Sequence, residues 1–515
     1  MEGKLSNYDQ VLYPSYSHPQ SHPDRLAVIS ALFGLQPAPM RGCRVLELGC
    51  GNGANLVPMA WELPGSDFLG IDLAGAPIAQ GQRMIADLGL ANIRLVHGSI
   101  TEVDEHWGVF DYIIAHGFYS WVPPEIQERL LAICRARLSA GGVAFVSYNA
   151  LPGCHLRNML REMMLFHVRG CQTPEERVKQ ALALVRFLAE GQATRDEYRL
   201  WMKAELDRII EHAEGHLYHD ELGEVNQPLY FIQFMEKAAA HGLDYVGEAD
   251  YFEMSDHIFC ESVRQTLQDL AHNRILREQY LDFLKCRRFR QTLLCHRQPA
   301  LLREPQAARV ADFLISSVSE FNTGSADLRP GVSSAFESRK GSSFETDFGL
   351  GKAAFAILAE AHGFPLAFEE LFRRAKAALG GAGDGDDDSA SRQALCGFLL
   401  RLYGAGMVEL RTSLPPITPV VTEHPIATPV ARWQIKQGNF VTSGFHMTVK
   451  VEDEIGRSLL SSLDGTADRK ALSEKVRHLL KSSDVLRGQD GGDRETEQML
   501  EKNLQKIARL GLLVG

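Results

Sequence analysis

The sequence predicts an α/β fold, with a doubly wound parallel sheet followed by two smaller helical modules. In roughly the first third of the chain, short β-rich segments alternate with amphipathic helical segments. The strand-like segments are nearly continuous apolar runs, as expected for strands that helices cover on both faces. At 515 residues the chain is too long for one ordinary core, so we expect two to four domains.

Five strands and three helices are expected before residue 150. The predicted strands are residues 43–49, 67–73, 93–98, 110–116 and 141–149. The predicted helices are residues 54–63, 77–88 and 125–138. This strict alternation favours parallel strands joined by crossover helices.

The segment from about residue 156 to 228 is predicted to be helical. Thr173, Pro174 and Glu176 form a capping box with proline at the first helical position. A helix at 229–241, strands at 243–251 and 287–297, and a helical run at 257–285 follow. We infer that the two late strands complete the sheet and that 156–228 is a helical insertion. The alternative is a separate helical domain after Asn149.

Two similar modules are expected at the C-terminal end. Residues 353–410 follow the order helix–helix–helix–strand, and residues 456–515 repeat it after a proline-rich connector at 414–429. Both modules finish on a helix, a glycine and a short apolar strand, in LLRLYGAGMVEL and LQKIARLGLLVG. This ending is typical of winged-helix modules. The predicted domains are therefore 1–300, 301–412 and 413–515.

The amino-acid composition limits which classes of partner and which cellular compartment we expect. The net charge is −11, and neither C-terminal module is basic, which argues against nucleic acid and favours protein contact. The nine cysteines form no CxxC pair, which is typical of a cytoplasmic protein without a disulfide framework. We see no secretory leader and no apolar window long enough for a membrane span.

The segment VLELGCGNG, residues 45–53, joins the first predicted strand to a helix. Its glycines allow a tight turn and close approach of a ligand. The segment also fits a loose dinucleotide fingerprint through Ala54, and a mere tight turn is a further alternative. However, Glu47 suits a cationic ligand rather than a pyrophosphate, and Gly53 comes one position early for a dinucleotide site. We therefore predict S-adenosylmethionine (SAM) as cofactor, bound by Glu47, Gly49, Gly51 and Gly53.

Other predicted cofactor contacts follow the next strands. Asp72 ends the second strand, where a carboxylate can accept hydrogen bonds from ribose hydroxyls. Ser99 ends the third strand, where the adenine ring is expected. A helix cap for Asp72 and a plain loop for Ser99 are the alternatives. Leu73, Ile100 and His116 complete the predicted cofactor set.

The segment FDYIIAHGFYSWVP ends the fourth strand, at the edge where ligands of such sheets bind. His116, Tyr119 and Trp121 are the predicted catalytic residues. The two aromatic rings can hold an ammonium group by cation–π contact, and His116 can accept a proton or shape the pocket. Core packing is the alternative for each. Tyr148 and Asn149 reach the same edge of the sheet.

A histidine-rich segment invites a metal site. It contains His212, His216, His219, Asp220 and Glu224. Their spacing matches no standard zinc pattern, so no metal is predicted.

Several of these segments resemble one bacterial family. VLELGCGNG, GIDLA, FDYIIAHGFYSWVP and GGVAFVSYNALPG are similar to class I methyltransferases that carry a methyltransferase regulatory domain. This family includes rickettsial-type protein lysine methyltransferases that act on outer-membrane proteins. LDYVGEADYF, FRQTLLCHR and LLSSLDGTADRKAL extend the resemblance over nearly the whole chain. One departure is Ser99, where many relatives of the wider class have aspartate.

The resemblance implies a Rossmann-like class I methyltransferase sheet and a residue 8–23 segment that folds over the cofactor. It also implies a homodimer formed through the helical insertion. We predict a SAM-dependent enzyme that methylates lysine amines of a protein by in-line transfer. Since the amine must be neutral, burial beside the cofactor's cation must lower its pKa. A small-metabolite methyltransferase and a non-catalytic SAM-binding regulator are the alternatives.

Overall fold

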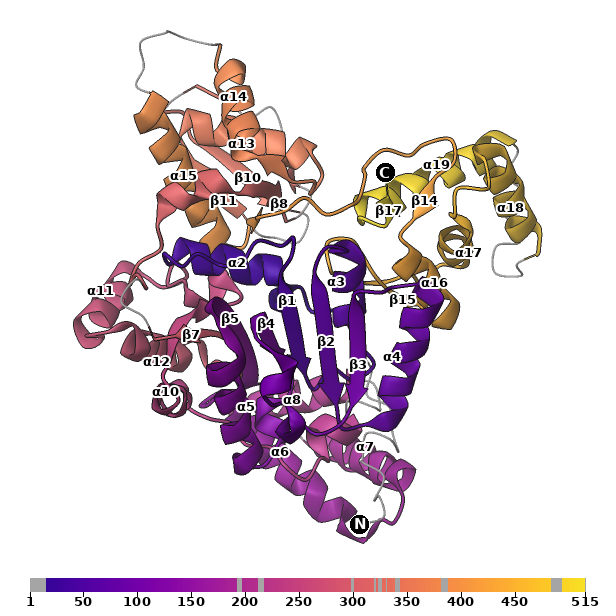
Figure 1. Ribbon diagram of the computed structural model, residues 1–515. Coiled ribbons are helices and arrows are strands. Elements are labelled where there is room, and N and C mark those ends of the chain that lie inside the picture. Colours follow the sequence, from indigo (N-terminus) through magenta and orange to yellow (C-terminus); the bar gives the residue numbers. More distant parts are fainter. Residues whose placement is uncertain are drawn as a thin grey trace.

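Figure 1 shows the computed structural model of the chain. The described residues are 15–191, 197–211, 217–297, 301–318, 321–322, 327–329, 331–338, 343–380, 388–482 and 493–514.

The centre of the molecule is a seven-stranded sheet with the order β3-β2-β1-β4-β5-β7-β6. In that order the strands are Ile93–His97, Asp67–Asp72, Arg44–Leu48, Phe110–Ala115, Leu138–Asn149, Phe289–His296 and Leu243–Glu248. Strands β1 to β5 are mutually parallel, whereas β7 runs antiparallel to both of its neighbours. The predicted α/β sheet and its late completion are confirmed, with the difference that one strand is antiparallel.

Helices cover both faces of the sheet, because successive side chains of a strand point to opposite faces. Val45 of β1 belongs to one buried cluster and Leu46 to the other. The first cluster includes side chains of α2 (Pro23–Leu32), α3 (Leu56–Glu62) and α4 (Gly75–Leu88). The second includes side chains of α5 (Pro124–Arg137) and α10 (Phe231–Ala240). Helices α11 (Glu261–Leu270) and α12 (Arg274–Lys285) lie between β6 and β7 in the chain.

The helical insertion comprises α6 (Cys154–His167), α7 (Pro174–Glu190), α8 (Glu197–Glu211) and a π-helical turn, η6 (Leu217–Glu221). The Thr173 side chain caps α7 by accepting from the Glu176 N–H, as predicted. The insertion has a small apolar core of its own around Leu160, Val185 and Leu206. In Figure 1 these helices lie at the end of the sheet toward which the arrows of β2 and β3 point.

The first C-terminal module packs directly on the core. Its three-stranded sheet has the order β12-β8-β13, with Leu366–Ala367, Leu314–Ser317 and Val408–Arg411. Helices α13 (Gly349–Glu360), α14 (Phe368–Ala378) and α15 (Asp388–Gly404) surround it, and η8 (Ala307–Asp312) precedes it. A second sheet joins β9 (Phe321–Asn322), β10 (Ser334–Ser338) and β11 (Ser343–Thr346). One buried cluster runs from the sheet face through this module, so the boundary at residue 300 remains a prediction.

The second module repeats the order of the first. Strand β14 (Ile426–Ala427) pairs with β17 (Leu513–Val514) and forms an isolated bridge with Asp464. It therefore has a neighbour on each side, just as β8 of the first module lies between β13 and β12. Helix α17 (Glu454–Ser462) precedes the bridge, and α18 (Arg469–Ser482) and α19 (Asp493–Arg509) follow it. Helix α16 (Pro429–Gln437) and the hairpin β15 (Phe440–Thr442)–β16 (Thr448–Lys450) are inserted after β14. This module has its own apolar core. The boundary at residue 412 likewise remains a prediction.

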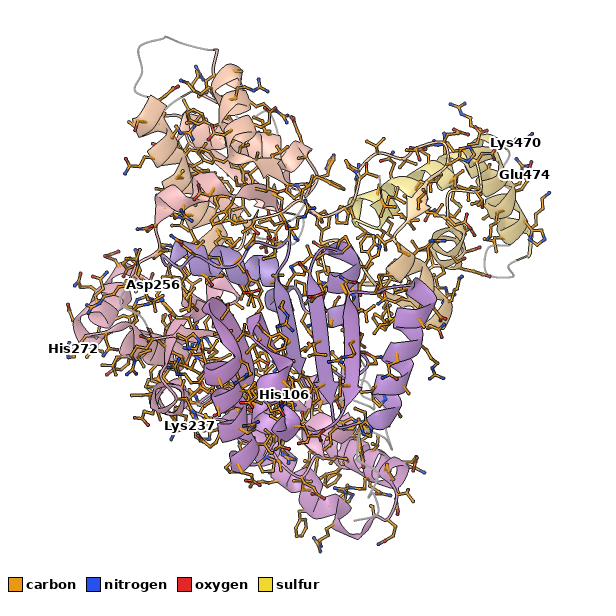
Figure 2. The ribbon with its side chains drawn as sticks, in the orientation of Figure 1. His106, Lys237, Asp256, His272, Lys470 and Glu474 are labelled. Atoms are coloured by element: carbon orange, nitrogen blue, oxygen red, sulfur yellow. The ribbon has the colours of Figure 1, made fainter. Side chains whose placement is uncertain are left out.

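The outer helix of the second module, α18, is predominantly basic, with Arg469, Lys470, Lys475, Arg477 and Lys481 against Glu474. Figure 2 shows Lys470 and Glu474 on the outer side of α18, away from the central sheet. Within the described ranges, no helix has the length and apolar character that a membrane crossing requires.

Candidate active site

A cavity of about 750 Å³ lies at the carboxyl ends of the parallel strands. Two groups of residues make up most of its lining. The sheet half consists of side chains and turns at the ends of β1 to β4: Glu47, Gly49, Cys50, Gly51, Asp72, Leu73, Ala74, Gly98, Ser99, Ile100, His116, Gly117 and Phe118. We define the insertion half as residues of α6, α8 and η6 together with three residues from outside the insertion, Trp121, Arg288 and Phe289. Its residues from the insertion are Arg157, Glu205, Arg208, Ile209, Asp220 and Glu221.

The glycine turn after β1 requires glycine at two lining positions. Gly49 and Gly51 have φ values of 77° and 55°, in the left-handed region that side chains disfavour. A Cβ on Gly49 would lie 2.4 Å from Cδ2 of Phe118. The predicted Gly53 does not line the cavity. Its Cβ would instead lie 2.9 Å from Leu95, so this glycine serves close helix–sheet packing.

Glu47 is a buried carboxyl group with one unpaired oxygen. Only 3% of the residue is exposed, and its Oε1 accepts a hydrogen bond of 2.8 Å from Asn55 Nδ2. The other oxygen, Oε2, has no hydrogen-bond partner. Burial raises the pKa of Glu47 to about 8. An unpaired acid in the wall of a cavity fits a ligand with a cationic group.

Asp72 orders the glycine turn as well as lining the cavity. Its Oδ2 accepts from the Gly51 N–H at 2.8 Å, and Oδ1 accepts from the Ala74 N–H at 2.8 Å. Ala74 is the N-cap of α4, and no side chain of the described residues caps that helix, so Asp72 orders the turn before the helix without being its cap. Leu73, beside it, lines the cavity with a largely exposed side chain.

Ser99 is occupied by local hydrogen bonds. Its hydroxyl accepts from the Thr101 N–H at 3.2 Å and from Thr101 Oγ1 at 2.8 Å, while its own N–H donates to Glu102. Ser99 thus forms a capping box for a short 3₁₀ helix. Both Ser99 and the buried Ile100 line the cavity. An adenine contact by Ser99 stays a prediction.

His116 stacks on the N-terminal segment. The rings of His116 and His18 are 3.7 Å apart, and His116 Nδ1 lies 3.5 Å from Ser147 Oγ. Burial holds the pKa of His116 well below its usual value, and it lowers the pKa of His18 to about 4. Both imidazoles are neutral near pH 7, so His116 is a weak proton acceptor that shapes the cavity.

The N-terminal segment reaches the cavity in its described part. Ser15, Tyr16 and His18 all contribute to the lining. Residues 8–14 of the predicted covering segment lie outside the described residues.

Trp121 and Tyr119 have different environments. Trp121 lies in the insertion half, with the Arg157 guanidinium 5.9 Å from its ring centroid. Tyr119 is 0% exposed and packs edge-on against Phe234, with ring centroids 5.2 Å apart. Its hydroxyl has no partner and it does not line the cavity. The expected catalytic contact of Tyr119 is therefore wrong, because the 3₁₀ turn at Tyr119–Trp121 turns this ring into the core.

The end of β5 contributes one lining residue. Asn149 lines the cavity, and its Nδ2 donates to Asn226 Oδ1 at 2.9 Å. Tyr148 is buried against Phe234, with ring centroids 4.3 Å apart. Of the two, only Asn149 can touch a ligand.

The insertion half is held together by ion pairs. Arg157 lies 2.7 Å from Glu221 Oε1, and Glu205 lies 2.5 Å from Arg288 and 3.5 Å from Arg208. Glu221 is only 1% exposed, and its Oε2 has no hydrogen-bond partner. These residues escaped the sequence analysis, because they come from distant segments and carry no local motif.

The histidine-rich segment is only partly described, because His212 and His216 lie outside the described residues. Across the part of the chain that is described, no three metal-ligating side chains come together.

Three family models match the chain. A methyltransferase domain matches residues 45–142, which include most of β1, the glycine turn and all of β2 to β4. A predicted methyltransferase regulatory domain matches residues 213–296. A "PKMT, C-terminal winged helix domain" matches residues 423–512, the second module.

Two proteins of Rickettsia prowazekii (strain Madrid E) are similar in sequence. Uncharacterized protein RP789 is 29% identical over 509 residues, which is 97% of this chain and 91% of that protein. Uncharacterized protein RP028 is 39% identical over 233 residues, which is 45% of this chain and 93% of that protein.

A solved structure is similar over almost the full length. It is PKMT2 from Rickettsia typhi in complex with AdoHcy, the product that SAM leaves after methyl transfer. The TM-score is 0.85 at 28% identity, and the match covers 98% of this chain and 100% of that one.

The sheet half of the cavity fits SAM. The unpaired Glu47 oxygen matches a cationic group, the glycine turn admits close backbone approach, and Asp72 lies where a ribose is expected. When bound, SAM supplies an activated methyl group. The chain belongs to the class I SAM-dependent methyltransferases that carry the predicted methyltransferase regulatory domain.

Proposed function

We propose that the enzyme methylates the side-chain amine of lysine in a protein substrate. The observation that carries this proposal is the full-length similarity to PKMT2, a rickettsial protein lysine methyltransferase, at a TM-score of 0.85. The match of the second module to the PKMT winged-helix domain supports it. Over residues 413–515 the charge is nearly balanced, with 14 Lys and Arg residues against 13 Asp and Glu residues, which favours contact with protein over nucleic acid.

The insertion half of the cavity supports an amine acceptor. Glu221 offers a buried carboxylate oxygen without a partner, while Arg157 holds its other oxygen. The Trp121 ring lies in the same part of the cavity, and an aromatic face attracts an ammonium or methylammonium group. We assign the binding of the lysine Nζ to Glu221 and Trp121.

The amine must lose a proton before it can accept a methyl group. An unperturbed lysine has a pKa of about 10.4, and burial next to Arg157 and Arg288 lowers it. The Glu221 carboxylate can take the proton or pass it to water. His116 is a poor candidate, because burial keeps the pKa of its imidazole well below the usual value.

One observation favours a second candidate. The insertion half balances three arginines against three acids: Arg157, Arg208, Arg288, Glu205, Asp220 and Glu221. Such a lining also suits a small zwitterionic acceptor, which would make the enzyme a metabolite methyltransferase.

Incubation with SAM that carries a trideuterated methyl group separates the candidates. Lysate fractions of the source cells are treated with the full-length enzyme and with the Gly49→Ala variant as the inactive control. We expect heavy methyl groups on lysine side chains in tryptic peptides, only with the wild-type enzyme. Label in small molecules alone would favour the metabolite enzyme. No label despite AdoHcy binding would favour a non-catalytic regulator.

We further propose a homodimer formed through the helical insertion. On the described part of the insertion, four large apolar side chains are exposed, namely Phe166, Phe187, Leu200 and Trp201, and such exposure is typical of contact surfaces. Light scattering coupled to gel filtration should give a dimer, and Phe187→Glu with Trp201→Glu should give a monomer. A wild-type monomer at micromolar concentration would contradict the proposal.

A further inference from the structure

A hairpin of the second C-terminal module reaches the wall of the SAM cavity. Strands β15 and β16 pair from Phe440–Lys450 to Thr442–Thr448, and the loop between them carries His446. His446 has φ 61°, in the left-handed region that non-glycine residues rarely adopt. The Gly444 N–H donates to the Gly511 carbonyl at 2.8 Å, which ties the loop to the end of the module. The loop thus holds His446 in a fixed place.

His446 is hydrogen-bonded to Asn55 of the methyltransferase core. Its Nε2 lies 2.9 Å from Asn55 Oδ1, and the two residues are 2% and 5% exposed. Asn55 Oδ1 also accepts from the His18 N–H at 2.9 Å, which fixes the orientation of the amide. Since an amide oxygen only accepts, His446 Nε2 must carry the hydrogen.

The nitrogen of the same Asn55 amide holds the carboxyl group of Glu47, which lines the SAM site. Asn55 Nδ2 donates to Glu47 Oε1 at 2.8 Å, and Glu47 Oε2 is left without a partner. Three side chains therefore form a continuous path from the second module to the SAM site. We propose that His446 is a positioning residue for SAM, which holds Asn55 and through it the Glu47 carboxylate. This role is independent of which acceptor the enzyme methylates.

The hairpin also holds the N-terminal segment over the cavity. Ser17 Oγ lies 3.0 Å from Thr448 Oγ1, and the Tyr16 ring packs edge-on against Phe440 at 5.3 Å. Tyr16 itself lines the cavity. One hairpin thus orients both Glu47 and the segment that covers the cofactor, so that docking of the module and SAM affinity are coupled.

His446 acts through a hydrogen bond and not through charge. Burial keeps its pKa well below the usual value, and the neighbouring His22, His18 and Arg411 lower it further. A neutral imidazole with its hydrogen on Nε2 is the form that Asn55 requires.

Calorimetric titration of the full-length protein with AdoHcy tests the proposal. His446→Ala removes the donor, and His446→Gln keeps a donor of similar reach. Trp433→Phe is the matched control, because it removes the 2.9 Å hydrogen bond from the same module to Asp87, away from the cavity. Loss of one buried hydrogen bond predicts about a tenfold higher Kd for His446→Ala. We expect His446→Gln and Trp433→Phe to stay within about twofold of the wild type.

Two results would overturn the proposal. One is an unchanged Kd for AdoHcy in His446→Ala. The other is a rise of the Kd in Trp433→Phe that equals the rise in His446→Ala, because SAM affinity would then depend on docking of the whole module and not on His446. In an Asn55→Ala background, His446→Ala should add nothing further to the Kd, because the two residues act in series. If His446→Ala does not fold, histidine ¹⁵N NMR of the wild-type protein decides. The Nε2–H tautomer at His446 is required, and the Nδ1–H tautomer contradicts the proposal.

Discussion

The two halves of the cavity are built in different ways. The sheet half consists of short turns that directly follow parallel strands, so the position of each lining residue depends on a few residues next to it in the chain. The insertion half joins Arg157, Glu205, Glu221 and Arg288, which lie far apart in the chain and meet as ion pairs. One scaffold can thus keep a locally encoded cofactor site beside a proposed acceptor site that depends on tertiary structure.

The electrostatics of the two halves differ as well. The sheet half holds one unpaired acid, Glu47, beside neutral histidines. In the insertion half, arginines and carboxylates alternate. We therefore expect changes in the sheet half to alter AdoHcy binding, and changes in the insertion half to alter methylation of the acceptor.

The largest effect is expected for Gly49→Ala. The added Cβ would lie 2.4 Å from Phe118 and would sit on a backbone with φ 77°. The turn must move, and displacement of a site by about 1 Å can cost about 100-fold in activity. Calorimetry should show AdoHcy binding weakened by a similar factor. Gly42→Ala is the control, since φ is 89° but nothing lies within 4 Å of its Cβ. Equal affinities of the two variants would contradict the account of the turn.

The next largest effect on AdoHcy binding is expected for Glu47→Gln. Loss of a buried carboxylate that pairs with a cation costs about 2 kcal/mol, or about 30-fold in Kd. Because the pKa of Glu47 in the free protein is about 8, ligand binding near pH 7 should release a proton. AdoHcy affinity should then rise with pH and level off above about 8. Titrations in buffers of different ionisation enthalpy measure the proton release. Release that persists in Glu47→Gln would assign it to another group.

The same shift has a consequence for folding. The pKa of Glu47 is raised from 4.5 to about 8 in the folded protein, so its contribution to stability is fully present below about 4.5 and is lost as pH rises through about 8. Thermal unfolding of the ligand-free protein should show this loss, and Glu47→Gln should lessen it.

Trp121→Ala tests the insertion half of the cavity. Removal of a cation–π surface is expected to lower kcat/KM for a protein acceptor by about tenfold. The Kd for AdoHcy should stay within about twofold, because Trp121 lies in the insertion half. Methylation assays at saturating SAM measure the first quantity and calorimetry measures the second. A fall in AdoHcy affinity without a change in kcat/KM would indicate that Trp121 contacts the cofactor and not the acceptor, which would contradict its assignment to the insertion half.

Tyr119→Phe should have the smallest effect. The hydroxyl is buried without a partner and away from the cavity, so its removal leaves turnover within about twofold and stability unchanged or up to ~1 kcal/mol higher. Turnover assays and chemical denaturation measure these. A tenfold loss of turnover would restore Tyr119 to the acceptor site.

The sheet half could be predicted from the sequence because its signals are local. Glu47, Gly49 and Gly51 lie in one turn, and Asp72 closes the next strand. Parallel strands bring all their carboxyl ends to one edge, so the order of the segments was enough to assemble the site. The direction of β7 was missed, because an apolar strand does not encode its orientation.

The insertion half could not be predicted, since its residues acquire their meaning only through packing. Glu221 and Arg157 belong to polar positions of ordinary helical segments. The Tyr119 assignment failed for a related reason. A strand end locates a backbone, but a single 3₁₀ turn sends Tyr119 into the core and Trp121 into the cavity. Likewise, nothing near His446 indicates that its hairpin meets Asn55.

Comparison of Glu221→Gln with Glu47→Gln tests the division of the cavity most directly. Both substitutions replace a buried carboxyl group that has one unpaired oxygen with an amide. The Kd for AdoHcy and the kcat/KM for lysine methylation are measured for both variants. We predict that Glu47→Gln weakens AdoHcy binding by about 30-fold, whereas Glu221→Gln leaves it within about twofold and lowers kcat/KM by about tenfold. Equal loss of AdoHcy affinity in the two variants would contradict the account.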